Sequence, residues 1–479
     1  MTERVVQVER VVQLEEEVVA LRAEVAGLKE QVGQLLAANA RLQAQLDKYR
    51  SEPPSFIKPS TPKPKDKAQK QPRRKRAKDQ NGARPREQTP TQIVQHKLQQ
   101  CPHCRYPLQH PQLALRRQVI ELPPPQPVEV TEHQLYKSWC PRCSKWRHAH
   151  VDLSSQVVGR QGRSQGRGRM GVRIASLIAY LRTSLRMPVR LIREYLHFVH
   201  QLLISTGEIV ELLHRVAEAP PVQQAQHEVH ERVRASRIVH GDETVWREEG
   251  QNGYVWCFCT PAGERYYEYD RSRGGAVAKR ILGSEFKGTL VSDFYAAYND
   301  FPGEHQRCWA HLLRDLHELK EEHKHSEYNQ EVLGWATELR ELYDTAQDAL
   351  SGPSPPTEEQ RECLYVQSVE ATAELGRRYA NAKEHRAHPC HTLAKRLLLH
   401  LDALFQFVLQ SGLSADNNLA ERCVRPVVVM RKVSGGTQSE RGSRTRMTLA
   451  SLFGTWRAKG LNPFNECLFL LSHPFTPLL

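Results

Sequence analysis

The sequence contains no apolar run long enough to cross a membrane, and Met1-Thr2-Glu3-Arg4 does not begin a signal peptide with a cationic start and an apolar core. Acidic residues are also in deficit, because 54 Asp and Glu stand against 68 Lys and Arg, which gives a formal net charge of +14. The first absence argues against a membrane or secreted protein, and the second favours a polyanionic partner. We therefore expect an intracellular, cytoplasmic protein of two or three domains.

Cysteine is scarce for a disulfide framework, with eleven residues in 479, and four of them form two Cys-x-x-Cys pairs. The pairs are Cys101-Pro102-His103-Cys104 and Cys140-Pro141-Arg142-Cys143, and two such knuckles supply four thiolates to one tetrahedral Zn²⁺. The 35 residues between them (105–139) fit a hairpin that bends at Pro123-Pro124-Pro125. The sequence predicts one structural zinc ion held by Cys101, Cys104, Cys140 and Cys143.

The first fifty residues follow a heptad pattern. β-Branched residues at a with Leu at d favour a parallel two-stranded coiled coil, and a buried Asn fixes its register. Residues at g and e′ carry opposite charges in three pairs, Arg10–Glu15, Glu17–Arg22 and Glu24–Lys29. Position a holds Val11, Val18, Val25, Val32, Asn39 and Leu46, and position d holds Leu14, Leu21, Leu28, Leu35, Leu42 and Tyr49. We expect a homodimer or a higher assembly.

The stretch from Lys58 to Arg86 has twelve basic residues against Asp66 and Asp79, a net charge of +10, and too few apolar residues to fold. Its cluster Arg73, Arg74, Lys75 and Arg76 is suited to phosphate contacts. A linker that only increases solubility explains the composition equally well.

A helical region follows a Gly/Arg-rich stretch at Arg160–Arg173. The pattern predicts helices over 172–185 and 189–203 and a third that opens with Ser205-Thr206-Gly207-Glu208, a capping box. The short turn before the third helix resembles a helix-turn-helix, which would place Glu208, Glu211 and His214 near a DNA groove. A helical bundle that supports the core is the alternative, because an acidic face is unfavourable against DNA.

Three acids have surroundings that suit a metal site. Asp242 ends an apolar run read as a strand over 234–242, Asp293 ends a second β-branched run, and Glu421 lies on a short helix that Asp416 or Asn417 could cap. A buried carboxylate requires a cation or hydrogen bonds to compensate its charge. Two strand-end Asp residues and a helical Glu are hard oxygen ligands that suit a pair of Mg²⁺ ions. Alternating strands and helices indicate a mixed α/β sheet, with a hairpin over 254–269, a helix over 275–282 and a helical insertion over about 312–410.

These residues also carry a family resemblance. The stretches Gly241-Asp242-Glu243-Thr244, Ser292-Asp293-Phe294-Tyr295-Ala296-Ala297-Tyr298, Cys308-Trp309-Ala310-His311 and Asp416-Asn417-Asn418-Leu419-Ala420-Glu421-Arg422-Cys423-Val424-Arg425-Pro426 resemble the core motifs of insertion-sequence-66 family transposases. The order of zipper, zinc module, helical region and core is similar as well. In the family's zinc module Gly often follows the second Cys, whereas Arg105 and Ser144 stand here.

The resemblance implies an Asp-Asp-Glu transposase with a ribonuclease-H-like α/β core, in which Asp242, Asp293 and Glu421 hold two Mg²⁺ or Mn²⁺ ions. The partner that it implies is double-stranded DNA, both at the element ends and at the target. For some elements it also implies small accessory proteins. Because DNA is the partner, a nucleoid association is expected. Arg422, Arg425, Arg431 and Lys432 would contact phosphates, Glu243 would point to the opposite face of the strand, and the Cys308/His311 element would be structural.

We expect a coiled coil (1–50), a basic linker (51–94), a zinc module (95–152), a helical, helix-turn-helix-like region (160–230), a catalytic domain (232–455) and a C-terminal helical extension (456–479). Two other functions fit the same sequence. A catalytically silent, zinc-containing dimeric DNA-binding regulator would need the zipper, linker and knuckles but not the three acids. A metal-dependent nuclease would use the acids without strand transfer.

The zipper generates the first testable prediction. Deleting residues 1–50, or replacing Leu21 and Leu28 with Pro, removes the seam that joins two chains, so the mass measured by light scattering should fall to that of a smaller assembly. An unchanged mass would contradict the coiled coil.

Overall fold

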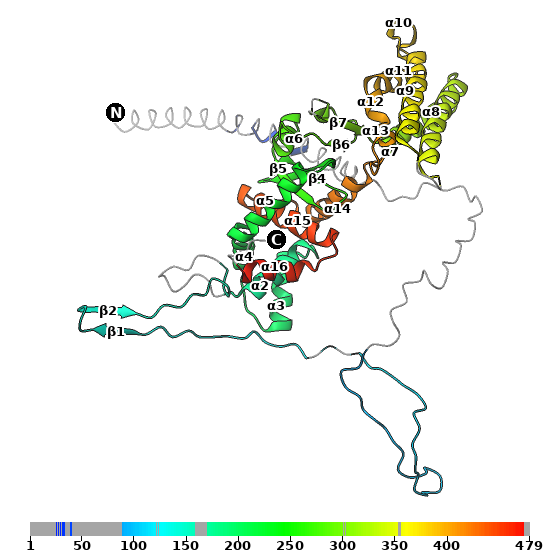
Figure 1. The fold of residues 1–479 in the computed structure, drawn as a ribbon. Coiled ribbons are helices and arrows are strands. Elements are labelled where there is room, and N and C mark those ends of the chain that lie inside the picture. The colour runs from blue at the N-terminus through cyan, green and yellow to red at the C-terminus, as the bar shows by residue number, and fades with distance from the viewer. Residues whose placement is uncertain are drawn as a thin grey trace, which may run out of the picture. The chain divides into compact units, whose positions relative to one another are not determined.

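The computed structural model describes residues 25, 27, 29, 31–33, 39, 40, 89–120, 122, 124–158, 170–299, 301, 303–352 and 356–473. It divides into two units, Met1–Glu121 and Leu122–Leu479, and each is described by itself (Figure 1). Most of the predicted coiled coil, the basic cluster at 73–76 and most of the Gly/Arg-rich stretch lie outside the described residues. The coiled coil and the basic linker therefore stay predictions.

In the first unit, the chain around the first Cys-x-x-Cys pair folds back on itself. Gln100 and Pro107 form an antiparallel bridge, and the backbone amide of Arg105 donates to the Cys101 carbonyl at 2.9 Å. The two cysteines therefore lie in one tight turn.

The second pair lies in a hairpin of β1 (Lys137–Cys140) and β2 (Lys145–His148), where Trp139 lies opposite Trp146. Cys140 and Cys143 flank its turn. The predicted longer hairpin across 105–139 is wrong, because the described residues between 108 and 136 contain no strand. Consecutive prolines supply no N–H donors for a ladder, which is consistent with this result.

Among the described residues from 170 onward, the sheet is preceded by α2 (Val172–Thr183), α3 (Val189–His200), α4 (Thr206–Glu218) and α5 (Pro220–Arg234). The three predicted helices are confirmed, and the Ser205 hydroxyl accepts from the Glu208 amide at 3.0 Å, as the capping motif predicts.

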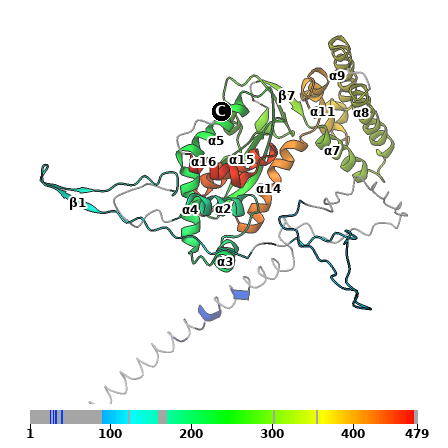
Figure 2. The same ribbon diagram turned by 60° about the horizontal axis from the view of Figure 1, so that its bottom comes forward.

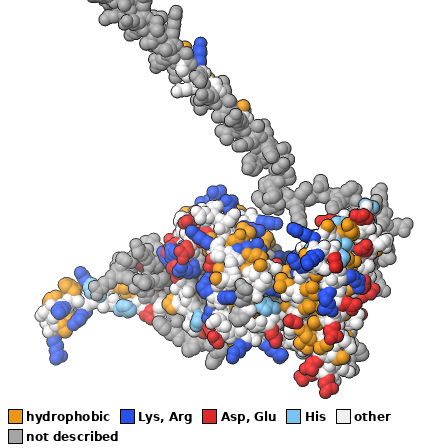
Figure 3. Space-filling model, turned by 90° about the horizontal axis from the view of Figure 1, so that it is seen from above, with side chains coloured by type: hydrophobic (Ala, Val, Ile, Leu, Met, Phe, Trp, Pro, Cys, Tyr) orange, Lys and Arg blue, Asp and Glu red, His pale blue; other side chains and the backbone are white. Residues whose placement is uncertain are grey.

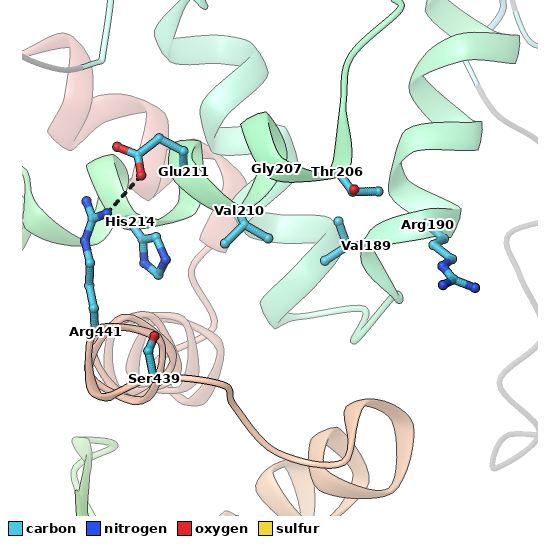
Figure 4. A pocket seen from close by; sticks show the side chains of 9 residues that line it. All are labelled: Val189, Arg190, Thr206, Gly207, Val210, Glu211, His214, Ser439 and Arg441. Carbon is cyan, nitrogen blue, oxygen red and sulfur yellow. Dashed lines mark hydrogen bonds and ion pairs between the residues drawn. The ribbon is translucent and has the colours of Figure 1, made fainter. Parts of the chain in front are cut away.

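The polar face of α4 is turned towards α15 (Glu440–Ala458). Arg441 donates to both Glu211 and Glu218, and His214 Nδ1 lies 2.7 Å from Thr445 Oγ1. Figure 4 shows Glu211, His214 and Arg441 on one wall of a 690 Å³ cavity between α3, α4 and α15. Because this face is occupied by protein contacts, the structure favours the supporting bundle over a groove-binding helix.

The sheet has five strands in the order β5-β4-β3-β6-β7. β3 pairs antiparallel with β4, which pairs antiparallel with β5, whereas β3, β6 and β7 run parallel. The strands are β3 (Ile238–Glu248), β4 (Gln251–Cys259), β5 (Arg265–Asp270), β6 (Thr289–Ser292) and β7 (Glu304–Arg307). The expected mixed α/β sheet is confirmed, including its hairpin.

The predicted strand over 234–242 has different bounds. Arg234 ends α5, the strand begins at Ile238, and it continues past Asp242 to Glu248 because β4 pairs with it along this length. Asp242 therefore lies within a strand and not at its end. The expected domain boundaries near 231 and 455 fall inside α5 and α15.

Each face of the sheet is covered by helices (Figure 2). On one face, α14 (Asn418–Ser434) packs against β3 and β4, with Val427 and Met430 against Trp246 and Val255. On the other face, α5 and α6 (Gly275–Leu282) join Trp256 and Phe258 in a larger core that includes α2, α4 and α16 (Pro463–Ser472).

Both edges of the sheet are capped by side chains. The backbone amides of Arg265 and Tyr267 on β5 donate to the hydroxyls of Thr455 and Ser451 on α15, both at 2.9 Å. On β7, the Gln306 side chain donates to the Leu404 carbonyl and accepts from the Phe407 amide. The two amides on the edge strand β5 are thereby satisfied, whereas on β7 the Gln306 side chain satisfies backbone groups of Leu404 and Phe407.

The predicted helical insertion is confirmed as a bundle next to β7 with its own core around Trp309 and Trp335 (Figure 1). None of the described helices is long and apolar enough to span a bilayer. The bundle comprises α7 (Trp309–Glu322), α8 (Asn329–Leu350), α9 (Glu358–Ala380), α10 (Ala382–His385), α11 (His391–Leu399), α12 (Leu401–Leu404) and α13 (Gln406–Leu409).

Candidate active site

The register of the sheet places Asp242 beside Asp293. The last parallel pair between β3 and β6 is His240 with Val291, and each acid lies two residues beyond its member of that pair. Side chains two residues apart on a strand share a face. The two acids therefore lie on one face, where β3 and β6 cease to pair.

Asn417 brings the third acid to this face. Its buried side chain donates from Nδ2 to the Gly241 carbonyl at 2.8 Å, and its Oδ1 lies 3.1 Å from His240 Nδ1. Its carbonyl accepts from the Glu421 amide at 3.1 Å, one turn into α14. Asn417 therefore fixes the start of this helix next to Asp242 instead of capping it through its side chain, and α14 is seventeen residues long rather than short.

The Cys308/His311 element contacts the same region. The Cys308 thiol accepts from the Asn417 backbone amide at 3.1 Å, which agrees with a structural role. His311 Nε2 lies 3.7 Å from Glu421 Oε1, and its Nδ1 is buried without a hydrogen-bond partner. We expected His311 to be structural only, but it borders the third acid.

Arg307 holds the loop that carries Asp293. Its buried guanidinium donates to the Ser292 hydroxyl at 2.9 Å, to the Asp293 carbonyl at 2.7 Å and to Asn299 Oδ1 at 2.7 Å. The Asp293 carboxylate accepts from the Tyr295 amide at 2.9 Å. The position of this acid is therefore fixed on both sides.

The electrostatics of Asp242 are unfavourable. Burial raises the pKa of its carboxyl group to about 7, and the nearby negative charges of Glu243, Asp293 and Glu421 act in the same direction. One hydrogen bond, from the Glu243 amide at 2.8 Å, offsets part of this. Burial also lowers the pKa of His240 to about 4, so the adjacent imidazole is neutral at pH 7 and supplies no positive charge.

Glu243 points to the opposite face of β3, as predicted. Its carboxylate accepts from Tyr298 at 2.6 Å and pairs with Arg273 at 2.7 Å, and its side chain is only 3% exposed. Arg273 in turn lies over the Tyr295 ring at 3.9 Å. Glu243 therefore has its own cation, whereas Asp242 has none among the contacts that the described residues make.

In the part of the chain that the structure describes, the three acids do not form one compact ligand set. Among the described residues, the His, Cys, Asp or Glu ligand atoms that all lie within 4.8 Å of one another belong to Cys257, Cys259 and Cys423, and not to the acids. A pair of metal ions about 3.5–4 Å apart uses outer ligands on opposite sides and a shared ligand between them. Asp242, with Asp293 and Glu421 near it, suits this arrangement.

Three of the four cationic residues predicted on α14 are exposed, namely Arg422, Arg425 and Lys432. Arg431 differs, because its guanidinium donates to the Thr244 hydroxyl at 3.2 Å and to the Val245 carbonyl. This residue fastens α14 to β3, so a phosphate contact by Arg431 is not supported.

In each knuckle, within its own unit, backbone amides point to the first of the two thiols and favour its thiolate. In the first, amides of Cys104 and His103 lower the pKa of the Cys101 thiol, and in the second the Cys143 amide lowers that of Cys140. Arg105 and Ser144, which follow the second Cys of each pair, have φ values of 61° and 49°. The turn keeps its left-handed residue without Gly, at a cost of about 1–2 kcal/mol each.

Sequence reasoning missed two residues that position the site. The sequence pattern indicates Asn417 only as a helix cap, and it does not indicate Arg307. The doubled Asn of Asp416-Asn417-Asn418 is a signal for the first, since a helix start needs only one cap. Nothing local distinguishes Arg307, because its partners are brought to it by the parallel pairing of β6 and β7.

Comparison with protein families now identifies relatives of this chain. The model of the Transposase IS66 family matches residues 167–445, more than half of the chain, including all three acids. The model of the zinc-finger binding domain of transposase IS66 matches residues 99–144, which contain both knuckles.

Two curated proteins from Sinorhizobium fredii (strain NBRC 101917 / NGR234) are similar. The uncharacterized protein y4qI is 25% identical over 263 residues, 49% of this chain and 47% of its own length, and y4jD is 26% identical over 211 residues, 41% and 40% respectively. This chain thus spans less than half the length of the relatives it matches. A chain in a simian T-cell lymphotropic virus intasome bound to PP2A regulatory subunit B56 gamma matches at 12% identity over 40% of this chain and 66% of its own, but its TM-score of 0.14 supports no structural argument.

The raised pKa of Asp242 predicts how stability depends on pH without metal. An unfolded Asp loses its proton near pH 4, whereas the folded one holds it to about pH 7, so stability should fall as pH rises across this window. Asp242→Asn should remove this loss and stabilise the metal-free protein at pH 8 by about 2–4 kcal/mol in urea unfolding with EDTA present. Glu440→Gln, an exposed acid paired with Arg444, is the control. A less stable Asp242→Asn protein at pH 8 would contradict this electrostatic account.

The knuckles predict a zinc ion that is independent of the acids. Replacing Cys101 or Cys140 with Ser should release one zinc per chain, measured by elemental analysis, and disrupt residues 95–150 without lowering the unfolding temperature of the sheet domain. Cys363→Ser, which changes an exposed thiol, is the matched control. If a variant lacking all four knuckle cysteines kept the zinc content of the wild type, the assignment would be wrong.

Proposed function

Because the chain belongs to the IS66 family of transposases, we propose that it cleaves DNA at the ends of an insertion sequence and joins the freed 3′ ends to target DNA. The observation that carries this proposal is the convergence of Asp242, Asp293 and Glu421 on one face of the sheet. Asp242 and Asp293 each lie two residues beyond the last parallel pair of β3 and β6, and Asn417 fastens the helix that bears Glu421 to β3. Metal-dependent phosphodiester chemistry requires this kind of acid cluster.

The sheet supports a ribonuclease-H-like core. Three antiparallel strands are followed by two parallel ones in the order β5-β4-β3-β6-β7, with α14 on the face that carries Asp242. The helical bundle enters between β7 and α14, so it separates Glu421 from the other two acids in sequence but not in space.

The residues present fit divalent metal ions. Asp242 is partly buried, its neighbours repel its negative charge, and a divalent cation would relieve both costs. The three donors are carboxylates, which suit Mg²⁺ or Mn²⁺. When bound, two such ions would activate the attacking water or 3′-hydroxyl and stabilise the departing oxygen.

The residues of the site would have different roles, some as metal ligands and others in positioning those ligands. Asp242 would serve both metal positions, with Asp293 and Glu421 each completing one. His311 would be a positioning residue, because its Nε2 lies 3.7 Å from Glu421 Oε1, within reach of an ion pair when the imidazole is protonated. Arg307 would position Asp293 through the backbone of its loop.

The outward face of α14 is the proposed contact for DNA near the cut. Arg422, Arg425 and Lys432 lie on the exposed side of the helix that bears Glu421, where they would bind phosphates. In the space-filling view, Lys and Arg side chains are spread over the surface in several groups, and acidic side chains gather towards the right (Figure 3). The surface is therefore not uniformly basic, and Arg422, Arg425 and Lys432 would bind DNA next to the three acids. The basic cluster Arg73, Arg74, Lys75 and Arg76 would add a salt-sensitive arm.

A paired complex of two element ends needs at least two protomers, which the N-terminal coiled coil would supply. Small accessory proteins are proposed partners for the same assembly. A silent DNA-binding regulator is the weaker alternative, because it would retain the destabilising burial of Asp242 without using it. A nuclease shares the acids, so the joining step decides between the two enzymes.

The acids generate the prediction that tests this function. Asp242→Asn, Asp293→Asn and Glu421→Gln keep shape but remove ligand charge, so each should lower cleavage and joining of DNA carrying the element's ends by roughly a thousandfold or more. DNA binding, measured by gel shift, should survive because it rests on basic residues.

Two controls make the result specific. Glu440→Gln should keep wild-type activity, whereas Glu243→Gln is a poorer control than its orientation suggests, because it leaves the Arg273 charge without its partner. Cleavage that persists in the Glu421→Gln protein would remove Glu421 from the site. Cleavage without joining in the wild type would favour the nuclease.

A further inference from the structure

Three buried cysteines meet beside the candidate active site. Cys257 and Cys259 lie two residues apart on β4 and so share a face, and Cys423 reaches them from α14. Their sulfur atoms all lie within 4.8 Å of one another, and the three residues are 0%, 0% and 6% exposed. These thiols are separate from the knuckles and are not ligands in the proposed reaction.

We propose that Cys257, Cys259 and Cys423 form a second zinc site, which ties α14 to the sheet. Zinc–sulfur bonds of about 2.3 Å place the sulfurs of a tetrahedral set about 3.8 Å apart, so small side-chain adjustments bring these three thiols to that spacing. Binding releases their protons to solvent as the ion is taken up on folding. Soft thiolates select such an ion over Mg²⁺, so the two kinds of site would not compete for one metal.

The charge around the cluster favours a divalent ion. Arg265 lies opposite Cys259 on β5, and its guanidinium charge acts on both Cys259 and Cys423. Three thiolates, one divalent ion and this guanidinium are together neutral, which a buried site requires. A monovalent ion would leave a buried negative charge. His240, opposite Cys259 on β3, is a side chain of suitable type for a fourth position, although its nitrogens lie outside the 4.8 Å group.

A zinc ion at this cluster would fix the position of Glu421 relative to Asp242. Cys423 is two residues beyond Glu421, and Cys257 lies directly opposite Asp242 in the strand register. An ion bound to both would hold the helix of Glu421 against the strand beside Asp242. The inference does not rest on the proposed function, because its readout is metal content.

The test measures the zinc content of the full-length protein. The protein is purified under reducing conditions and incubated with Zn²⁺, and unbound Zn²⁺ is then removed. We expect two zinc ions per chain in the wild type and one in Cys257→Ala, Cys423→Ala and Cys101→Ser. Cys467→Ala, which changes another buried thiol, should keep two. One zinc in the wild type, fully lost in Cys101→Ser, would overturn the proposal.

A second measurement covers variants that fail to fold. Titration of the Cys101→Ser protein with Co²⁺ should give one equivalent with a sulfur-to-cobalt charge-transfer band, and its absence would overturn the proposal. Both Zn²⁺ and Cu⁺ bind thiolates, so anaerobic incubation with Cu⁺ tests which of these two ions the cluster prefers. Retention of one Cu⁺ with exclusion of Zn²⁺ from the cluster would overturn the zinc assignment.

Discussion

The side chain of Asn417 is the contact on which the geometry of the candidate active site depends. It joins the start of α14 to the Gly241 carbonyl and to His240, while its backbone amide binds the Cys308 thiol. Three segments far apart in the sequence therefore meet at one buried amide. Because an unsatisfied buried polar group costs about 1–3 kcal/mol, these partners hold one another in a single arrangement. Glu421, one turn further along the helix, takes its position from this junction.

The cluster of acids destabilises the same region of the fold. Partial burial and the nearby carboxylates raise the pKa of Asp242 to about 7, so the metal-free site is destabilising at and above neutral pH. Its neighbour Glu243 shows the alternative, because on the opposite face of the same strand it is paired with Arg273 and Tyr298. A fold that neutralises one of two adjacent acids and leaves the other without a cation is consistent with a site reserved for a metal.

The helices around the sheet supply the rigidity that such a site needs. Hydroxyls of α15 satisfy the backbone of β5, and Gln306 joins β7 to the helical bundle. Arg431 fastens the far end of α14 to β3, so this helix is held at both ends. Loosening either end would shift Glu421 relative to Asp242, and the proposed catalytic geometry would be sensitive to such a shift.

The sequence by itself determined the elements and the chemical types. Apolar runs and the capping motif at Ser205 are local signals, and they placed the hairpin, α4 and α6 where the structure has them. The three acids and the two Cys-x-x-Cys pairs were visible for the same reason. Only the tertiary structure decided that β3 continues past Asp242, since a pairing with β4 extends it. Likewise, His311 borders Glu421, Arg431 faces β3, and Cys423 meets the thiols of β4 only because chain folding brings them together. Such long-range contacts are set by strand register and helix packing, which no local pattern encodes.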